Sequence, residues 1–163
     1  ELGALPGTDS GTTKIPNAVL HTNDSNRFEA RHVNLKVNSS NKSFFLDKYE
    51  TDQVLAIPNA HAEGKLILDK DKLTEIESNN QVAFRYCNSE GSLEAGYPWN
   101  PNGAPNDIAG ITNSRGNVLG MMPHPERVFH GWQHTDWTST GKNPDGPGDG
   151  RALFEGVVEF LCK

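Results

Sequence analysis

The stretch GNVLGMMPHPERVF, residues 116 to 129, contains the strongest local structural signals in the sequence. An apolar run ends at Pro123, and His124 and Glu126 then alternate with Pro125. Each proline fixes its own φ angle and pushes the preceding residue toward an extended backbone. We therefore expect a rigid, non-helical corner from which the side chains of His124 and Glu126 leave on the same face.

A histidine and a carboxylate on one face form two thirds of a nucleophile–histidine–acid triad. The carboxylate fixes the tautomer of the imidazole and stabilises the imidazolium. The corner also follows an apolar run that is typical of a strand, and sites in α/β proteins commonly lie beyond the ends of strands. We therefore interpret His124 and Glu126 as catalytic residues rather than as a solvated turn, and the nucleophile must come from elsewhere.

Length and composition indicate one globular domain over residues 1–163, with 34% hydrophobic and 22% charged residues. Fifteen basic and 21 acidic residues give a net charge of −6 without a long basic block, which argues against nucleic-acid binding. No apolar run approaches the roughly 18–20 residues of a membrane-spanning helix, and no signal segment is visible. Two cysteines are too few for a disulfide framework, so we expect a cytoplasmic protein.

Hydrophobic periodicity predicts strands and flanking helices, hence an α/β packing of layers. One or two strands are expected in 17–38, strands on both sides of a loop that contains His61, a strand at 81–88, and a hairpin at 108–126 around Asn113–Gly116. A short polar helix or turn is expected at 69–80, an ordered loop at 89–107 and a long loop at 130–150. The final segment predicts a helix whose apolar face is formed by Leu153, Phe154, Val157, Val158 and Leu161.

Neither cysteine has the setting of a nucleophile. A catalytic thiol needs a lowered pKa, commonly at a helix N-terminus, and backbone amides that stabilise an oxyanion. Cys87 instead ends a predicted strand and runs into Asn-Ser-Glu-Gly, and Cys162 is the penultimate residue of the predicted helix. We interpret both as packed side chains.

Two His-x-Glu pairs, His61 with Glu63 and His124 with Glu126, also permit a metal site. His130 and His134 have the i, i+4 spacing of ligands on a helix, but no acidic residue of an H-E-x-x-H motif lies between them. A metal-dependent hydrolase is therefore the weaker alternative, and we expect no metal.

Two further patterns leave alternatives open. Arg27, Glu29 and Arg31 alternate and share one strand face, but spacing alone does not distinguish a site from an exposed ladder of charges. Trp132 and Trp137 in the predicted long loop are interpreted as a local hydrophobic contact rather than as a binding surface.

Taken together, these segments resemble the glutamine amidotransferase subunit or domain of phosphoribosylformylglycinamidine synthase, an enzyme of de novo purine biosynthesis. The matching stretches follow the family's order and cover nearly the whole chain: NDSNRFEAR, AHAEGK, FRYC, YPWNPNGAPNDIAGITNSRGNVLGMMPHPERVF and GDGRALFEGVVEF. The resemblance implies a class I glutamine amidotransferase-like, flavodoxin-like α/β fold, a three-layer sandwich around a mixed sheet.

The same resemblance implies a glutaminase reaction. A cysteine thiolate attacks the side-chain amide of L-glutamine, His124 activates that thiol and protonates the leaving ammonia, and Glu126 orients His124. The ammonia passes to a formylglycinamide ribonucleotide synthetase subunit or domain, which uses ATP and Mg²⁺ to form the amidine; no cofactor is expected in this chain. His61 and Glu63, together with Asn23 and Ser25, are implied around the glutamine pocket.

Two departures from the family pattern bear on these expectations. The family's nucleophile lies in a Gly-x-Cys-x-Gly elbow followed by a helix whose end resembles ELGALPG, the first residues here. We therefore expect the elbow and the first strands upstream of Glu1, this chain to be the C-terminal part of a single domain, and no activity by itself; a non-catalytic docking module is the alternative. Ala62 replaces the first glycine of a family His-Gly-Glu-Gly loop, which costs about 1 kcal/mol if that position has a positive φ.

Overall fold

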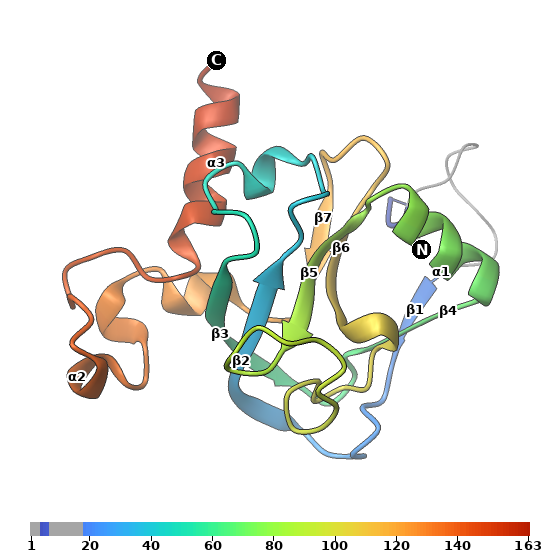
Figure 1. Ribbon diagram of the computed structural model, residues 1–163, viewed down its shortest axis with the longest axis horizontal. Helices are drawn as coiled ribbons and strands as arrows, with labels where there is room; N and C mark the ends of the chain where they lie inside the picture. Colours follow the sequence, from blue (N-terminus) through green and yellow to red (C-terminus); the bar gives the residue numbers. More distant parts are fainter. Residues whose placement is uncertain (1–3, 7–17) are drawn as a thin grey trace.

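The computed structural model describes residues 4–6 and 18–163, which form one curled sheet, one strand pair and surrounding helices (Figure 1). The five-stranded sheet has the order β3-β2-β5-β6-β7, and β1 pairs with β4 beside it. The bounds are β1 Ala18–His21, β2 Glu29–Val37, β3 Val54–His61, β4 Lys65–Leu68, β5 Val82–Cys87, β6 Ile108–Thr112 and β7 Leu119–Met121. Every pairing between these described strands is antiparallel, so the parallel part of the expected mixed sheet does not occur among them.

Alternation along β2 and β3 determines which face of the sheet is buried. On β2, Val33, Leu35 and Val37 are buried, and on β3, Leu55 and Ile57 are buried. These side chains pack with Phe84 and Tyr86 of β5 and with Val128 and Leu153 from the C-terminal third, in the larger core cluster. The predicted strands and the hairpin are confirmed, since alternation places one set of side chains on one face.

Helix α1, Lys70–Ser78, covers the sheet near β5 and β6 through the buried side chain of Ile76. It begins after Asp69, whose carboxylate accepts the Lys72 N–H at 2.7 Å, as in a standard N-cap. It ends at the predicted pair Asn79-Asn80, where Asn80 has a φ of 55°, a conformation that no helix continues. The expected short polar helix is thus confirmed.

Helix α3, Arg151–Leu161, packs with a 3-10 helix at Phe44–Leu46, and the Phe44 and Phe160 rings stack at 4.1 Å. Leu153 is buried, but Val158 and Leu161 are 60% and 75% exposed and Cys162 is exposed as well. The predicted helix is confirmed, and Leu153 and Phe154 of its apolar face pack against the core, whereas the prediction that Cys162 is a packed side chain is wrong. The helix projects beyond the core at its C-terminal end (Figure 1).

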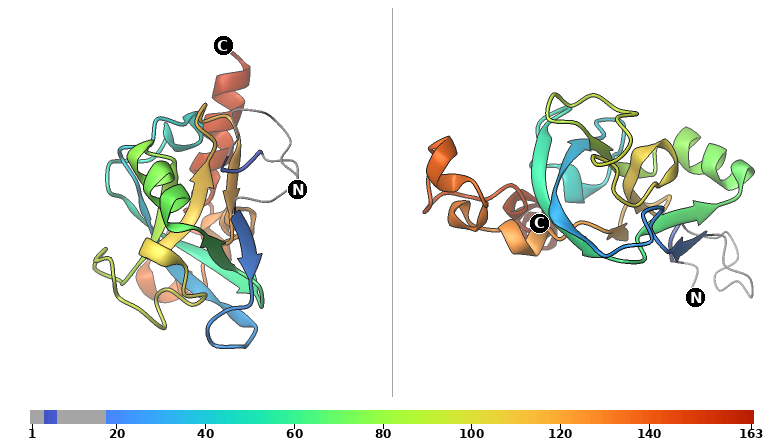
Figure 2. Two further views of the ribbon diagram at one scale, coloured as in Figure 1. Left: turned by 90° about the vertical axis from the view of Figure 1, so that its right-hand side faces the viewer. Right: turned by 90° about the horizontal axis from the view of Figure 1, so that it is seen from below.

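The segment 130–150 projects from the β3 side of the sheet (Figure 2). It was expected to be a loop and contains a 3-10 helix at Gly131–Gln133 and the short helix α2, Trp137–Thr140. Its two ends pair with each other, because His130 bridges to Pro147 and the Gly148 N–H donates to Phe129 O at 2.9 Å. The segment 130–150 therefore begins and ends beside the turn 125–128.

No helix among residues 4–6 and 18–163 is long and apolar enough to cross a membrane.

Candidate active site

The side chains of His124 and Glu126 are in contact, as the sequence predicted. Nδ1 of His124 lies 2.8 Å from Oε1 of Glu126, and the two side chains are 32% and 55% exposed. A carboxylate only accepts hydrogen bonds, so the pairing assigns the ring proton to Nδ1 and leaves Nε2 free as a base. This is the orientation that a general base on a nucleophile requires.

The local backbone differs from the expected extended corner. Residues Pro125–Val128 form a 3-10 helix, and His124 is its N-cap with φ −104° and ψ 88°. Proline is well suited to the first position of a helix, because its missing N–H needs no partner there. Pro125, one of the two prolines that indicated an extended segment, thus begins a tight helical turn, and this turn brings the imidazole and carboxylate together.

The turn is fixed from both sides. The His124 N–H donates to Pro58 O at 2.7 Å, which ties the turn that follows β7 to β3, the strand at the other end of the sheet. Downstream, Gly150 lies against Pro125 so closely that an added β-carbon would stand 2.0 Å from Pro125 O. The position of His124 therefore depends on segments far from it in sequence.

His61 lies near His124 at the same end of the sheet. It is 7% exposed, and its Nδ1 lies 3.1 Å from Oδ1 of Asn23, so the amide oxygen accepts the ring proton. Its Nε2 is buried and has no hydrogen-bond partner among the described residues. Burial lowers the pKa of His61 below its ordinary value, the charge of His124 lowers it further, and Glu29 opposes both. His61 is therefore a neutral ring with an available acceptor.

Asn23 holds this region together rather than presenting a free polar group. Its Nδ2 donates to His61 O at 2.8 Å and to Arg27 O at 2.9 Å, and its Oδ1 accepts the Gly64 N–H at 3.1 Å. All its side-chain atoms are thus used within the protein. A direct contact of Asn23 with a substrate stays a prediction, whereas its support of His61 is part of the structure.

The other two predicted pocket residues have different surroundings. Ser25 lines an open hollow of about 530 Å³ with Arg27 and Tyr97, and its Oγ has no partner within the described part of the chain. Glu63 is exposed between β3 and β4 and has no hydrogen bond or ion pair with any described residue. The structure brings His61, Asn23 and Ser25 to one end of the sheet, and a role for Glu63 stays a prediction.

Buried polar groups on β2 and β3 were not identified from the sequence. Glu29 is 3% exposed, pairs opposite His61, and is bonded to Arg31 at 2.5 Å, so an exposed ladder of charges is not formed. Asn59 is 2% exposed and neither of its side-chain polar atoms has a partner among the described residues. The available signal was the period of two, since Asn59 and His61 continue the buried face of Leu55 and Ile57.

Three further expectations concern side chains around this site. Cys87 is fully buried, and burial raises its pKa to about 11, which opposes formation of a thiolate. Ala62 is absent from the residues with positive φ, so the replacement of a family glycine there does not strain the backbone. Trp132 is 53% exposed and stacks on His130, and Trp137 is partly buried.

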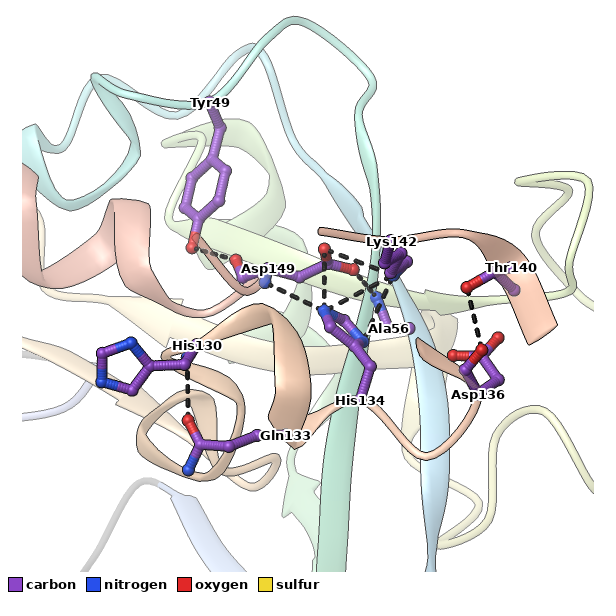
Figure 3. Close-up of polar contacts among 9 residues, drawn as sticks. All are labelled: Tyr49, Ala56, His130, Gln133, His134, Asp136, Thr140, Lys142 and Asp149. Carbon is purple, nitrogen blue, oxygen red and sulfur yellow. Dashed lines mark hydrogen bonds and ion pairs between the residues drawn. The ribbon is translucent and has the colours of Figure 1, made fainter. Parts of the chain in front are cut away.

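No group of three or more His, Cys, Asp or Glu side chains that could hold a metal ion occurs in residues 4–6 and 18–163. His130 and His134 do not share a site, because His130 stacks on Trp132 whereas His134 is buried between Lys142 and Asp149 (Figure 3).

Comparison with known proteins places this chain in a family. The family model described as the CobB/CobQ-like glutamine amidotransferase domain matches residues 1–161. The subunit PurQ of phosphoribosylformylglycinamidine synthase from Archaeoglobus fulgidus is 44% identical over 169 residues, covering 100% of this chain and 59% of the relative. The corresponding subunit from Picrophilus torridus is 44% identical over 124 residues, covering 76% of this chain and 47% of the relative.

A solved structure gives the same result for the fold. The structure of PurLQS from Thermotoga maritima superposes with a TM-score of 0.63 at 27% identity, over 91% of this chain and 55% of that chain. This chain therefore spans about half the length of the relatives that it matches, and the expected class I amidotransferase-like α/β fold is confirmed. The chain belongs to the CobB/CobQ-like glutamine amidotransferase domain family.

Proposed function

We propose that the protein to which this chain belongs hydrolyses L-glutamine and supplies the ammonia to a formylglycinamide ribonucleotide synthetase. The observation that carries the proposal is the hydrogen bond between His124 Nδ1 and Glu126 Oε1, on a turn anchored to β3. Its support is the 44% identity to two PurQ subunits of phosphoribosylformylglycinamidine synthase.

In this reaction His124 takes the proton of a cysteine thiol at Nε2, and the thiolate attacks the amide carbon of glutamine. The tetrahedral oxyanion collapses as His124 returns the proton to the leaving nitrogen, so ammonia departs and a glutamyl thioester remains. A water molecule, deprotonated by His124, then hydrolyses the thioester to glutamate. Glu126 keeps the imidazole in the required tautomer and stabilises its protonated form.

The thiol comes from a segment other than residues 18–163, because Cys87 is buried with a raised pKa and Cys162 lies at the exposed end of α3. An apolar cleft of about 260 Å³ between the β1–β4 pair and strands β6 and β7 reaches Met122, two residues before His124. We propose that the cysteine-bearing segment of the same domain packs in this cleft, and that this chain is the C-terminal part of that domain.

The proposal extends to surroundings and cofactors. ATP and Mg²⁺ act in the synthetase partner, and the glutaminase step needs no cofactor in this chain. His61, Ser25 and the buried carboxylate of Glu29 surround the glutamine at the same end of the sheet. The protein acts in the cytoplasm, where free thiols persist.

The experiment is treatment of the full-length protein, in complex with its synthetase, with an electrophilic glutamine analogue, followed by intact mass and peptide mapping. We expect one adduct, on a cysteine outside residues 18–163, with loss of ammonia release. An adduct on Cys87 would show that the nucleophile is assigned wrongly. No adduct and no ammonia release would favour a docking module without catalysis.

A further inference from the structure

The outer edge of β3 connects two segments that are 25 residues apart in sequence. β3 is the terminal strand of the sheet, and the backbone groups of Ala56 and Pro58 that point away from β2 bond to residues outside the sheet. The Ala56 N–H donates to Oδ2 of Asp149 at 2.7 Å, and Pro58 O accepts the His124 N–H at 2.7 Å. Asp149 and His124 are thus bonded to the same strand edge, two residues apart.

The carboxylate of Asp149 is itself held by His134, which is buried, and by Lys142, which is partly exposed (Figure 3). His134 is 2% exposed, and its Nε2 lies 3.2 Å from Oδ1 of Asp149. The ammonium of Lys142 lies 3.2 Å from Nδ1 of His134 and 3.7 Å from Oδ1 of Asp149. Nε2 of His134 also accepts the backbone N–H of Asp149 at 3.3 Å, so both the carboxylate and the main chain of Asp149 lie against this ring. Oδ1 of Asp149 therefore contacts His134 and Lys142, and Oδ2 accepts the hydrogen bond from β3.

The main chain at Asp149 is fixed to the turn at His124 as well. Asp149 O accepts the hydroxyl proton of Tyr49 at 3.1 Å, and the next residue, Gly150, donates its N–H to Val128 O at 3.1 Å. Gly150 also lies against Pro125, the residue that follows His124. Asp149 is therefore linked to His124 by two routes, through the edge of β3 and through the turn 125–128.

We propose that Asp149 is a positioning residue for His124: its carboxylate fixes the edge of β3, and Pro58 on that edge fixes the backbone of His124. The catalytic consequence rests on the proposed function, since it takes His124 as the base. In this proposal Asp149 contacts neither the substrate nor the reacting atoms. It acts by holding the turn that carries His124 in its position on β3. His134 and Lys142 keep the carboxylate in the rotamer that reaches Ala56.

The amide proton of His124 reports this coupling directly. Pro123 and Pro125 have no amide proton, so in a peptide that spans both prolines the amide of His124 is isolated between them. Hydrogen–deuterium exchange followed by mass spectrometry, performed on the full-length protein with its partner, thus measures the bond from His124 to Pro58 as the difference in uptake between overlapping peptides that end at Pro123 and at Pro125. Peptides from β5 report global opening, and peptides from β3 report the Ala56 amide.

Three variants separate the possibilities. Asp149→Ala removes the acceptor for Ala56, and we expect exchange of both the Ala56 and His124 amides to accelerate about tenfold while β5 stays protected. Asp149→Asn keeps an amide oxygen for Ala56 without the charge, and we expect it to restore protection of both amides. Asp145→Ala is the matched control, since Asp145 is exposed on the same segment and its carboxylate has no partner among the described residues.

Activity gives a second readout. For Asp149→Ala we expect kcat to fall about tenfold with KM unchanged, and Asp149→Asn to recover most of the loss. If the Ala56 amide of Asp149→Ala exchanges faster but the His124 amide does not, the proposal is overturned. It is also overturned if the amides of β5 exchange faster too, because Asp149 would then be a residue of general stability. If the wild-type protein releases no ammonia, the proposed function fails, and the exchange arm still decides the coupling between Asp149 and His124.

Discussion

The backbone of Gly64 lies against the imidazole of His61, since an added β-carbon would stand 2.1 Å from the ring atom Cε1. The ring is also held at Nδ1 by Oδ1 of Asn23, which accepts the Gly64 N–H as well. We predict that Gly64→Ala displaces His61 and lowers kcat/KM for glutamine by about tenfold. Steady-state ammonia release checks this, with Ala62→Gly as the control.

The Ala62→Gly control has an expected outcome of its own. Ala62 does not have a positive φ, so a glycine there relieves no strain and only adds freedom to the unfolded chain. We expect the free energy of unfolding to fall by up to about 1 kcal/mol with activity retained. A more stable Ala62→Gly protein would contradict this description of the loop.

Glu126→Gln tests the partner of His124. The amide keeps the shape of the side chain but supplies no negative charge for the imidazolium, so we expect kcat to fall about 100-fold with little change in folding. Glu90→Gln is the matched control, because Glu90 is exposed in the loop after β5. Equal activity of Glu126→Gln and wild type would remove Glu126 from the catalytic residues.

Cys87 is predicted to be inert toward alkylating agents in the folded protein. Burial raises its pKa to about 11, whereas Cys162 is exposed on α3. At neutral pH iodoacetamide should modify Cys162, and Cys87 only after denaturation, as read by peptide mass. Cys87→Ala should retain glutaminase activity and lose about 1 kcal/mol of stability. Rapid modification of Cys87 in the folded state would restore it as a candidate nucleophile.

Stability should fall in mild acid because of His61. Its pKa is lowered in the folded state, mainly by burial, so below the unfolded value of about 6.5 the unfolded chain binds the proton more readily. The contribution is complete above that pH and is lost as the pH falls toward the folded pKa. Denaturant unfolding at several pH values should show that the free energy of unfolding of His61→Gln depends less on pH than that of wild type. His21→Gln changes an exposed ring and should follow wild type.

The sequence predicts this fold well where one face of an element is buried. Strands β2, β3 and β5 follow the period of two, and α1 ends at the asparagine pair that indicated its end. The apolar pattern of α3 was misleading, because spacing defines a face but not how much of that face meets a neighbour. Leu153 is buried and Phe160 stacks on Phe44, but Val158 and Leu161 of the predicted face remain exposed.

The candidate site was predictable where it is local in sequence. The pair His124 and Glu126 is two residues apart and could be identified, although the backbone between them is a 3-10 helix. The buried groups of Glu29 and Asn59 were not identified, although both continue the buried face that the period of two defines on β2 and β3. The contact of Asp149 with Ala56 joins residues far apart in sequence, and no spacing rule indicates it.

Pro58 has a consequence for self-association. A terminal strand usually offers alternating N–H and C=O groups to which another chain can add a strand. On β3, Pro58 has no N–H, its carbonyl is bonded to His124, and the Ala56 N–H is bonded to Asp149. An incoming strand would have to displace the turn at His124 before it could pair. Protection from fibril-like assembly and the placement of the proposed base therefore depend on the same backbone groups, which are the Ala56 N–H, the Pro58 carbonyl and the His124 N–H.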